Sequence, residues 1–507
     1  MGFETGIFDN AEIHSDFIDW LVESQWPQLN MHFEKLWNYY ANPMIQINDS
    51  RLIENGHRYI QAQELGLPAR ITGYTHTGSL GTRQLSDVQR KEVVIENDIA
   101  WRVNAIVDFL FGKPVSIVSK SPDSGKSAEI EMLLKALFSA NGGIGFFQDL
   151  AVLGSVYGFV DCFVRPGEQL LSNVTSNSFY KSSMDTRKKV SIENAMRWVQ
   201  AITLELIEAP RALPVLDEND YKRIEFYVQN FYQKKNSLTS KGSFLSRILS
   251  PNKQAAGNRQ SVCVTEITSA NAWQRYEDKE LVAEGKLPWG FLPVVHIQNI
   301  AQPYYYEGHS DVEPLIPLQD ELNTRLSDRA SRITFQSFKM YLGKGIDGFE
   351  NKPVSPGRMW YTDNTEASIE SFGGDEATPS EGLHITEIRE AMDKVSSVTP
   401  IVAGVLKDRV GNLTSAVALK LTLMGMLSKN ERKRFTYSEG IKQICKMVLS
   451  MLDTAGIYKT KTEDRNIDVI FASPLPENTM EKLEEAKLKK ELGVSTEQLL
   501  RELGYEN

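Results

Sequence analysis

The segment closest to a catalytic motif is SPDSGKS, residues 121–127. A phosphate-binding P-loop reads G-x-x-x-x-G-K-[ST], because glycines and free amide groups let the backbone surround the phosphates. Here Lys120 occupies the place of the first glycine, and Pro122 has no amide proton. The segment therefore predicts a solvated turn before a helix over residues 126–140. A nucleotide-dependent hydrolase that uses Lys126 is the alternative.

Other residues capable of chemistry are scattered. The GGIG segment at 142–145 follows a predicted helix, whereas a dinucleotide-binding loop follows a strand. The seven histidines show no HExxH pattern, and Cys162, Cys263 and Cys445 lie far apart among apolar neighbours. We expect three buried free thiols in a reducing compartment. The sequence thus predicts a protein that is not an enzyme and that uses no metal or cofactor.

Length and composition are those of a folded, soluble protein. The 507 residues suggest about three or four domains. With 41% hydrophobic and 24% charged residues, the chain is neither disordered, fibrous nor a disulfide miniprotein. Its formal net charge of −10 is opposite in sign to that of proteins that grip DNA over a broad surface. The sequence shows no signal-peptide pattern and no run of 18 apolar residues, so we expect a cytosolic chain without membrane contact.

The first 300 residues mix helical and strand patterns. Aromatic residues at spacings of three and four predict helices within 14–66, and residues 99–110 predict an amphipathic helix that Gly112 and Pro114 end. Residues 145–165 predict a helix and then a strand, and period-two segments within 196–232 predict an antiparallel sheet. The Ser-, Asn- and Lys-rich segment 233–260 predicts a mobile basic insertion, either a solvated hairpin or an arm that touches phosphate or a partner.

The following segments predict two helices around a compact excursion. A long helix should open at Pro314 and Pro317 and run to about Leu342. Residues 343–381 are rich in glycine and proline and contain two strand-like pieces, GRMWYT and ASIESF. A second helix begins near Leu383 and stops at Pro400. A short loop, a helix over about 414–455, a strand (IDVIFAS) and a charged helix complete the chain.

In this order, the segments resemble those of the portal proteins of tailed bacteriophages, of the siphophage type. The resemblance begins near residue 90 and rests on several segments together: NDIAWRVNAIVDFLFGKPVSI, DLAVLGSVYGFVDCFV, GFLPVVHIQN, GHSDVEPLIPLQDELNTRLSDRASRI and GNLTSAVALKLTLMGMLSKNERKRF. Thr414 and Ser415 stand near a Ser-Gly of the family, so the missing glycine is a departure.

The resemblance implies an α+β portal fold with a mainly helical wing and crown, and two long stem helices that flank a small α/β clip. Subunits of this family form a ring, commonly of twelve. The implied parts are a wing (1–312, with the insertion 233–260), stem helices (313–342 and 383–399), a clip (343–382), a tunnel loop with a long wing helix (400–455) and a crown (456–507).

The resemblance also implies functional residues. The tunnel loop would place Lys407, Arg409 and Asn412 toward DNA, although Lys407 and Arg409 could instead pair with Asp408 or a neighbouring subunit. The basic stem residues are Arg325, Arg329, Arg332 and Lys339, for which salt bridges between subunits or toward the capsid are the alternative. The clip residues expected to dock partners are Trp360, Tyr361 and Phe372.

The implied function is a channel at one capsid vertex for DNA packaging and ejection. The implied partners are further copies of the chain, the terminase large subunit, the head–tail adaptor, the major capsid protein with its scaffold, and double-stranded DNA bound without sequence specificity. The protein would be assembled in the host cytoplasm and reside in the virion. A non-portal oligomeric scaffold is the remaining alternative.

Overall fold

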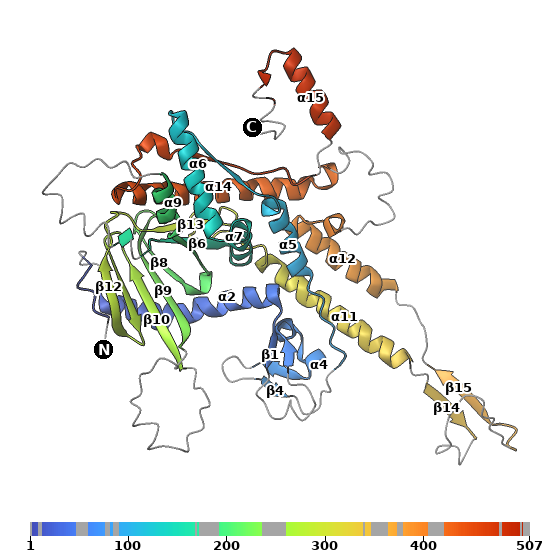
Figure 1. Ribbon diagram of the computed structural model, residues 1–507. Coiled ribbons are helices and arrows are strands. Elements are labelled where there is room, and N and C mark those ends of the chain that lie inside the picture. The colour runs from blue at the N-terminus through green and yellow to red at the C-terminus, as the bar shows by residue number, and fades with distance from the viewer. Residues whose placement is uncertain are drawn as a thin grey trace, which may run out of the picture. The chain divides into compact units, whose positions relative to one another are not determined.

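The chain folds into two compact units, each built from segments distant in sequence (Figure 1). Unit 1 comprises Met1–Phe33, Asn104–Ser310 and Met424–Asn507, and unit 2 comprises Glu34–Val103 and Asp311–Leu423. The structure, a computed structural model, describes residues 3–8, 13–46, 59–76, 82–84, 91–167, 170–171, 192–235, 260–337, 340–345, 363–372, 379–403, 420–475, 479–496 and 499.

A five-stranded antiparallel sheet forms one layer of unit 1. Its order is β12-β11-β10-β9-β8, from β8 (Ala212–Leu216), β9 (Ile224–Lys235), β10 (Gln260–Thr268), β11 (Ala272–Glu277) and β12 (Glu280–Lys286). Helix α1 (Ser15–Trp20) and the π-helical turn η1 (Leu21–Gln25) cover one face, and Phe3, Ile18 and Leu21 are buried against Val228 and Ile267. Of the aromatic residues in the sequence pattern, Phe17 and Trp20 are exposed and Trp26 is only partly buried, so Phe3, Ile18 and Leu21 supply most of the core on this face.

A second sheet in unit 1 has β6 (Phe159–Arg165) between β13 (Val294–Gln298) and β7 (Thr203–Ile207). Helix α7 (Ile144–Tyr157) leads directly into β6, and Gly158 makes the turn with a φ of 91° that favours glycine. Helix α14 (Met424–Thr454) packs on β13. A Cβ on Gly440 would lie 2.4 Å from Ile297 Cδ1, so this glycine permits close packing between helix and strand.

The remaining described elements of unit 1 are short or peripheral. Strand β5 (Ser116–Ser119) pairs antiparallel with β16 (Ile467–Ile470), which joins residues far apart in sequence. Its helices are α6 (Ser124–Ala140), α9 (Ile192–Gln200) and α15 (Thr479–Glu491).

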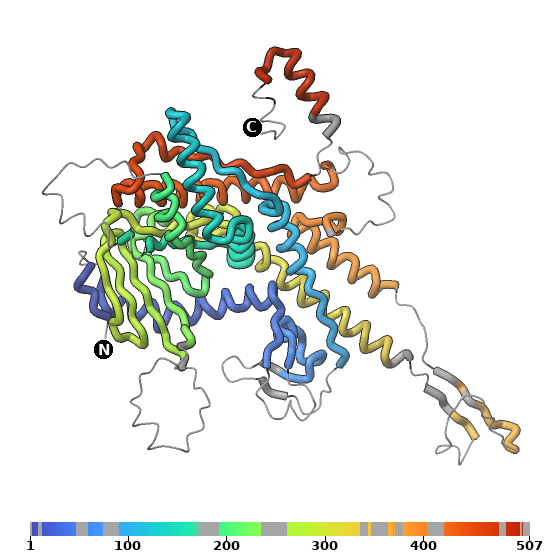
Figure 2. The backbone as a smooth tube through the Cα atoms, in the orientation of Figure 1, coloured from blue at the N-terminus to red at the C-terminus, as the bar shows by residue number. Residues whose placement is uncertain are grey.

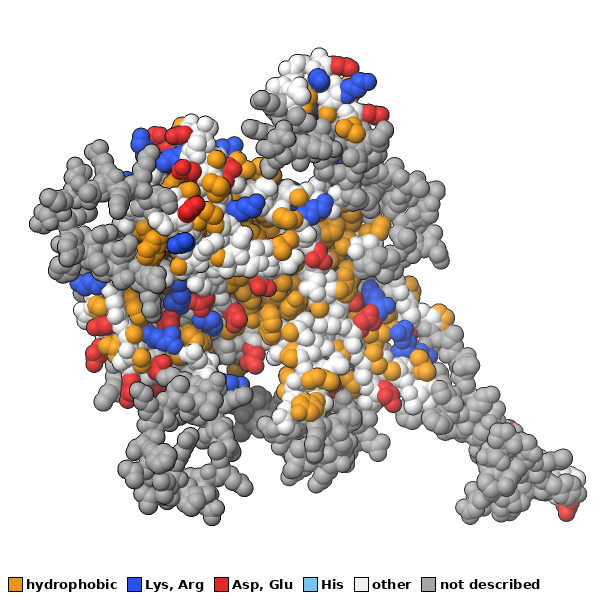
Figure 3. Space-filling model, viewed as in Figure 1, with side chains coloured by type: hydrophobic (Ala, Val, Ile, Leu, Met, Phe, Trp, Pro, Cys, Tyr) orange, Lys and Arg blue, Asp and Glu red, His pale blue; other side chains and the backbone are white. Residues whose placement is uncertain are grey.

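Half-buried ion pairs connect the two larger sheets of unit 1. Arg165 of β6 contacts Glu266 of β10 at 2.7 Å and also pairs with Glu205 of β7. Glu266 in turn contacts Arg275 of β11 at 2.9 Å. On the face seen in Figure 3, basic and acidic side chains are interspersed over the region of this sheet. These strands therefore do not present a surface of a single charge on that face.

The described residues of unit 2 contain a pair of long helices and three two-stranded antiparallel sheets. The chain enters it through α2 (Trp26–Ala41), forms the β1–β2 hairpin (Met44–Gln46, Tyr59–Gln61) and leaves through α5 (Asp98–Phe111). After returning it forms α11 (Ile316–Ser337), strands β14 (Met340–Lys344) and β15 (Ser368–Phe372), and α12 (Pro379–Ser396). The short elements are η2 (Ala62–Gly66), α4 (Ala69–Thr72), β3 (Tyr74–His76), β4 (Thr82–Gln84), η6 (Glu313–Leu315) and η7 (Pro400–Ala403).

The α+β character is confirmed, and three expected boundaries are corrected. The first long helix ends at Ser337 rather than Leu342, because Met340–Lys344 pair with Ser368–Phe372 as a strand. The second starts at Pro379, since proline is accepted in the first helical turn. Residues 14–66 are not helical throughout, because the chain turns at Asn42, with a φ of 43°, into β1. The part expected to be mainly helical also holds both larger sheets.

Candidate functional site: the α11–α12 helix pair

Helices α11 and α12 are the two helices that the sequence places around the excursion, and their backbones lie next to each other (Figure 2). Their packing positions are buried: Leu322 and Leu326 on α11, and Ile385, Ile388 and Met392 on α12. These residues recur at spacings of three and four, so each helix carries one apolar stripe.

A second stripe on α11 is polar and buried. It consists of three fully buried residues spaced four apart, namely Gln319, Asn323 and Ser327. Their side-chain oxygens accept hydrogen bonds from the backbone of an extended segment: Asp98 N to Gln319 at 3.1 Å, Glu96 N to Asn323 at 3.0 Å and Val94 N to Ser327 at 2.9 Å.

The two repeats match in length. Four residues of an α-helix advance about 6.0 Å, and two residues of an extended chain advance about 6.6 Å. The helix therefore satisfies alternate amide groups of residues 94–98 much as a neighbouring strand would. This contact fixes α11 against the segment that begins α5.

Two of the predicted stem arginines are engaged within the chain. Arg325 Nε lies 2.6 Å from Glu321 Oε1, and its Nη1 lies 3.3 Å from Asp328 Oδ2. Arg332 forms an ion pair with Glu381 of α12. Arg329 is half-buried and makes no hydrogen bond or ion pair with the described residues. Lys339 lies outside the described residues.

The pKa values of the acidic partners follow from these contacts. Partial burial alone would raise the pKa of Glu321, but hydrogen bonds from Arg325 and His384 outweigh it and lower that pKa below its usual value. Burial also opposes ionisation of Asp328, while Arg70, at 2.7 Å, lowers the pKa of its carboxyl group. Both acids are therefore charged partners of Arg325 and Arg70 at neutral pH.

A buried arginine anchors the C-terminal end of α12. Arg102 of α5 is 2% exposed, and its Nη1 contacts Asp393 Oδ1 at 2.6 Å and the Val398 carbonyl at 3.1 Å. Its Nη2 lies 3.5 Å from Asp98, and the guanidinium group stacks 4.4 Å from the Trp101 ring. A charge in such a place is stable only with its partners present.

The strands β14 and β15 follow α11 and precede α12 in sequence. They form an antiparallel pair from Met340↔Phe372 to Lys344↔Ser368. Lys344 and Glu370 form an exposed ion pair at 2.8 Å. Phe372 is thus at the base of this hairpin, while Trp360 and Tyr361 lie outside the described residues. The predicted tunnel-loop residues Lys407, Arg409 and Asn412 also lie outside them.

The segment that resembles a P-loop, residues 121–127, is held in place by carboxylates of the same chain. Asp123 caps α6, with its Oδ1 accepting from Gly125 N at 3.0 Å and Lys126 N at 3.4 Å. Lys126 Nζ lies 2.6 Å from Asp464 Oδ2, and Ser121 donates to the same carboxylate at 2.7 Å. Carboxylates thus occupy both the amide groups and the lysine that a phosphate would need.

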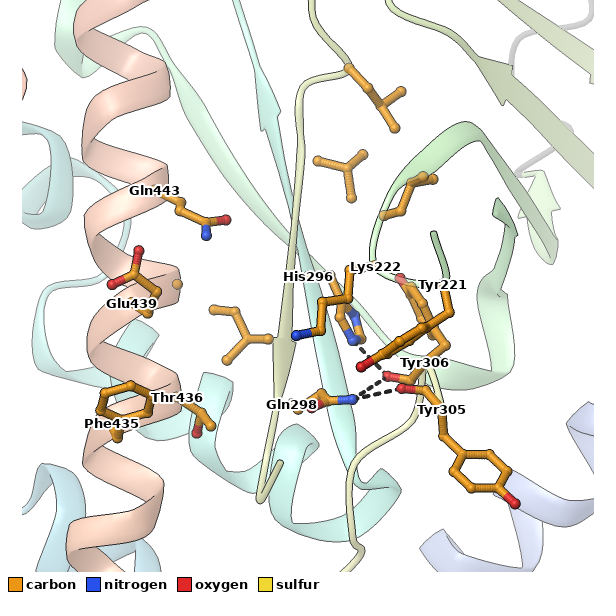
Figure 4. Close-up of a pocket in the computed structure, with 15 residues that line it drawn as sticks. Tyr221, Lys222, His296, Gln298, Tyr305, Tyr306, Phe435, Thr436, Glu439 and Gln443 are labelled. Carbon is orange, nitrogen blue, oxygen red and sulfur yellow. Dashed lines mark hydrogen bonds between the residues drawn. The ribbon is translucent and has the colours of Figure 1, made fainter. Parts of the chain in front are cut away.

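Unit 1 contains a cavity of ≈ 430 Å³ whose lining includes His296 and Tyr306 (Figure 4). These two residues also belong to a buried polar cluster centred on Asp161. Asp161, 0% exposed, accepts from Tyr227 Oη at 2.7 Å and Tyr306 Oη at 2.9 Å. Its Oδ1 lies 2.7 Å from His296 Nδ1, and His296 Nε2 donates to the Tyr306 carbonyl at 2.8 Å. Burial, followed by the Asp161 charge, raises the pKa of both tyrosines.

This histidine–aspartate pair does not have the geometry of a general base. A base needs a ring nitrogen whose lone pair points to the reacting proton, whereas a carbonyl can only accept, so His296 Nε2 carries a proton. The cluster stabilises the junction of β6 and β13. Among the cysteines, Cys162 and Cys445 are buried and Cys263 is half-buried, which corrects the expectation of three buried thiols.

Sequence reasoning missed the residues with the most demanding contacts. Arg102, Asp393 and the Gln319–Asn323–Ser327 stripe were not singled out. The i, i+4, i+8 repeat of polar residues on an otherwise apolar helix face is a signal that could have found the stripe. Arg102 gave no such signal, since its partners are remote in sequence.

The described residues offer neither a cluster of potential metal ligands nor a helix suited to span a membrane. They contain no group of three or more His, Cys, Asp or Glu side chains positioned to hold a metal ion. They also contain no helix of the length and apolar character that crossing a membrane requires.

Comparison with known proteins defines the family. The family model described as phage portal protein, SPP1 Gp6-like, matches residues 102–505. The chain belongs to this family of phage portal proteins. A search of the curated proteins finds no match.

Two solved structures from gene transfer agent particles are distantly similar. A chain from the virion of a native particle has 11% identity and a TM-score of 0.38, covering 80% of this chain and 90% of its own. A chain from the neck of an empty particle, computed with C6 symmetry, has 11% identity and a TM-score of 0.42, covering 81% and 90%.

Proposed function

We propose that this portal protein forms a ring-shaped channel at one capsid vertex, through which DNA is packaged and later ejected. The observation that carries the proposal is the interrupted helix pair, in which α11 and α12 flank the β14–β15 hairpin. The family match over residues 102–505 includes this whole arrangement. Long helices with apolar and charged stripes supply the different contact faces that a closed head-to-tail ring needs.

The parts of the chain follow from this proposal. With the helix boundaries as the structure has them, residues 313–337 and 379–399 form the stem, the segment between these two ranges forms the clip, and residues 400–455 form the tunnel loop with the long wing helix. Residues 1–312 form the main part of the wing and 456–507 the crown. The clip, with Trp360, Tyr361 and Phe372, docks the terminase motor and then the head–tail adaptor, while the body contacts the major capsid protein and scaffold.

Electrostatics suit a channel that lets DNA slide. The chain carries a net charge of −10, so a ring of twelve would carry about −120, against a duplex with one charge per ~1.7 Å. The pairing of Arg325 with Glu321 and of Arg332 with Glu381 neutralises cations on the stem. Tight, sequence-specific binding is therefore not expected, and a few loop cations suffice for phosphate contact.

The decisive experiment is native mass spectrometry of the full chain together with electron-microscope images of the same sample. We expect closed rings of about a dozen subunits, with a central hole wide enough for duplex DNA. A closed dimer that buries α11 and α12 would overturn the proposal. An assembly without an open axial channel would instead indicate a protein-binding scaffold.

The tunnel-loop role of Lys407 and Arg409 is tested in assembled particles. If these side chains contact phosphates, the double variant Lys407→Ala/Arg409→Ala should retain less packaged DNA and should form rings normally. The comparison is the amount of encapsidated DNA per particle. Normal retention by the variant would show that the loop does not hold DNA.

The hydrolase alternative has no observation in its favour, because Lys126 and the start of α6 are engaged by carboxylates.

A further inference from the structure

Strand β5 of unit 1 has one edge that pairs and one that does not. Its pairing edge faces β16, where Lys120 N donates to the Asn466 carbonyl at 2.8 Å. In an antiparallel pair, successive residues direct their backbone groups to opposite edges. Ser119 accordingly points away from β16: its N–H donates to Glu131 Oε1 at 2.9 Å, and its carbonyl accepts from Ser127 Oγ at 3.2 Å.

Ile117 follows the same alternation as Ser119. Its N–H and carbonyl therefore face the edge opposite β16, and they have no hydrogen-bond partner among the residues that the structure describes. An unpaired strand edge is a template for another extended backbone, and proteins usually cover or charge it. Here α6 covers only the Ser119 end, through Glu131 and Ser127.

A groove of ≈ 620 Å³ borders this open edge. One wall is the chain from Pro114 to Val118, and the other comes from α6 and the start of α7. The lining includes Met132 and Ile144, whose side chains remain 46% and 40% exposed. Exposed apolar surface beside unpaired backbone groups suits an extended peptide, which hydrogen-bonds along the edge and places alternate side chains in the groove.

The charges around the groove add a requirement. Lys120 and Lys126 nearby are paired with Asp468, at 3.2 Å, and Asp464, at 2.6 Å. Lys135, which lines the groove, is exposed and has no ion pair with the described residues. An occupant that carries a carboxylate would complement it. Glu131 also lines the groove, and its carboxylate accepts the hydrogen bond from Ser119 N–H.

We propose that the β5–α6 groove binds a short extended segment of a partner protein, added as a strand to the Ile117 edge, with apolar side chains at alternate positions and an acidic residue opposite Lys135. Because the Ser119 end is closed, the segment pairs over about three or four residues, or ~10–13 Å. This surface lies outside the helix pair and is independent of the proposed channel.

The probe is a pool of labelled, acetylated and amidated hexapeptides with Val, Ile, Leu or Thr at alternate positions and one Glu. Binding to the full chain is measured by fluorescence anisotropy. We expect binding to the wild type, at least tenfold weaker binding when the pool is N-methylated on one set of alternate amides, and little change when it is methylated on the other set. A scrambled pool without alternation should not bind.

Protein variants test the same contacts. Ile117→Pro removes the amide proton that Ile117 directs to the open edge and keeps the amides that face β16, so it should weaken binding at least tenfold with little change in melting temperature. Lys135→Glu should weaken binding of the pool that contains Glu and strengthen binding of a matched pool in which Lys replaces that Glu. If Ile117→Pro fails to fold, Lys135→Glu and the methylated probes still decide. Absence of binding to the wild type, or binding indifferent to methylation and to Lys135→Glu, would overturn the proposal. A third contrary result is that the wild type binds no peptide while Ile117→Pro fails to form rings. That result would assign the groove to a second copy of this chain.

Discussion

At the scale of single residues, Lys126 illustrates how a catalytic-looking side chain can be structural. Its ammonium group reaches Asp464, whose carboxylate also accepts from the Lys461 backbone N–H at 2.8 Å. The hydrogen bond from Lys126, followed by that from Lys461, lowers the pKa of Asp464 to about 2. This contact joins the start of α6 to the turn before β16, and so supports the same strand that β5 pairs with.

The depressed pKa predicts an acid-dependent loss of stability. The folded state binds this proton less readily than the unfolded chain, whose value is near 3.8. The stabilising contribution is therefore fully present above pH ~4 and is lost as the pH falls to about 2. Asp464→Asn should lower the free energy of unfolding by about 1–3 kcal/mol at pH 7, with the difference from wild type shrinking over that window.

Urea unfolding between pH 7 and pH 2 measures this difference. Asp468→Asn is a matched control, because that side chain is 47% exposed and its pair with Lys120 should contribute at most about 1 kcal/mol. A wild-type-minus-Asp464→Asn difference that stayed constant down to pH 2 would contradict the assignment.

At the scale of elements, the end of α12 depends on a charge in α5. Arg102 is almost fully buried and takes its closest contact from Asp393. Removing one partner from a buried ion pair leaves the other charge without compensation, which costs far more than losing an exposed pair. The helix pair should therefore be more sensitive at this point than at its surface salt bridges.

We predict that Asp393→Asn destabilises the protein by about 3–5 kcal/mol. The matched control is Arg389→Gln, which breaks an ion pair with Glu96 in which both side chains are about two-fifths exposed and should cost at most about 1 kcal/mol. Chemical unfolding followed by circular dichroism measures both. Equal, small effects of the two substitutions would show that Arg102 finds a sufficient partner in Asp98 and the Val398 carbonyl.

Elements that rest on local patterns could be predicted from the sequence. The helix that Gly112 and Pro114 end is α5 at Asp98–Phe111, and the helix-then-strand at 145–165 is α7 and β6. Strand β14 could not be predicted from the sequence, because the apolar residues of β14 continue the helical stripe of α11. Its partner strand β15 also lies beyond a long intervening segment. Arg102 was missed for a related reason: burial of its charge depends on Asp393, remote in sequence.

At the scale of the whole molecule, the excursion between α11 and α12 can be separated from the rest. Replacing residues 340–372 with a Gly/Ser linker should leave ring formation intact, because the stripe contacts of α11 and the apolar faces of both helices remain. Docking of the packaging motor or the adaptor should be abolished. Pull-down of these partners by purified rings, with images of the rings, measures both outcomes.

A substitution within the hairpin serves as the control. Lys344→Ala with Glu370→Ala removes an exposed pair whose two side chains are 56% and 58% exposed, so docking should persist. If rings of the variant with the linker in place of residues 340–372 still bind both partners, the proposed docking role of the clip is wrong.

The way the chain passes between its units bears on its synthesis. Unit 2 is complete once Leu423 has emerged from the ribosome, but unit 1 still lacks α14 and β16. The Gly154 and Ser155 surface of α7, which receives Tyr437 and Lys433, must therefore wait for some 280 further residues, or about 15–60 s at bacterial rates of translation. A nascent chain would leave this surface uncovered for that whole interval, and chaperone dependence should consequently end only when the last sixth of the message has been translated.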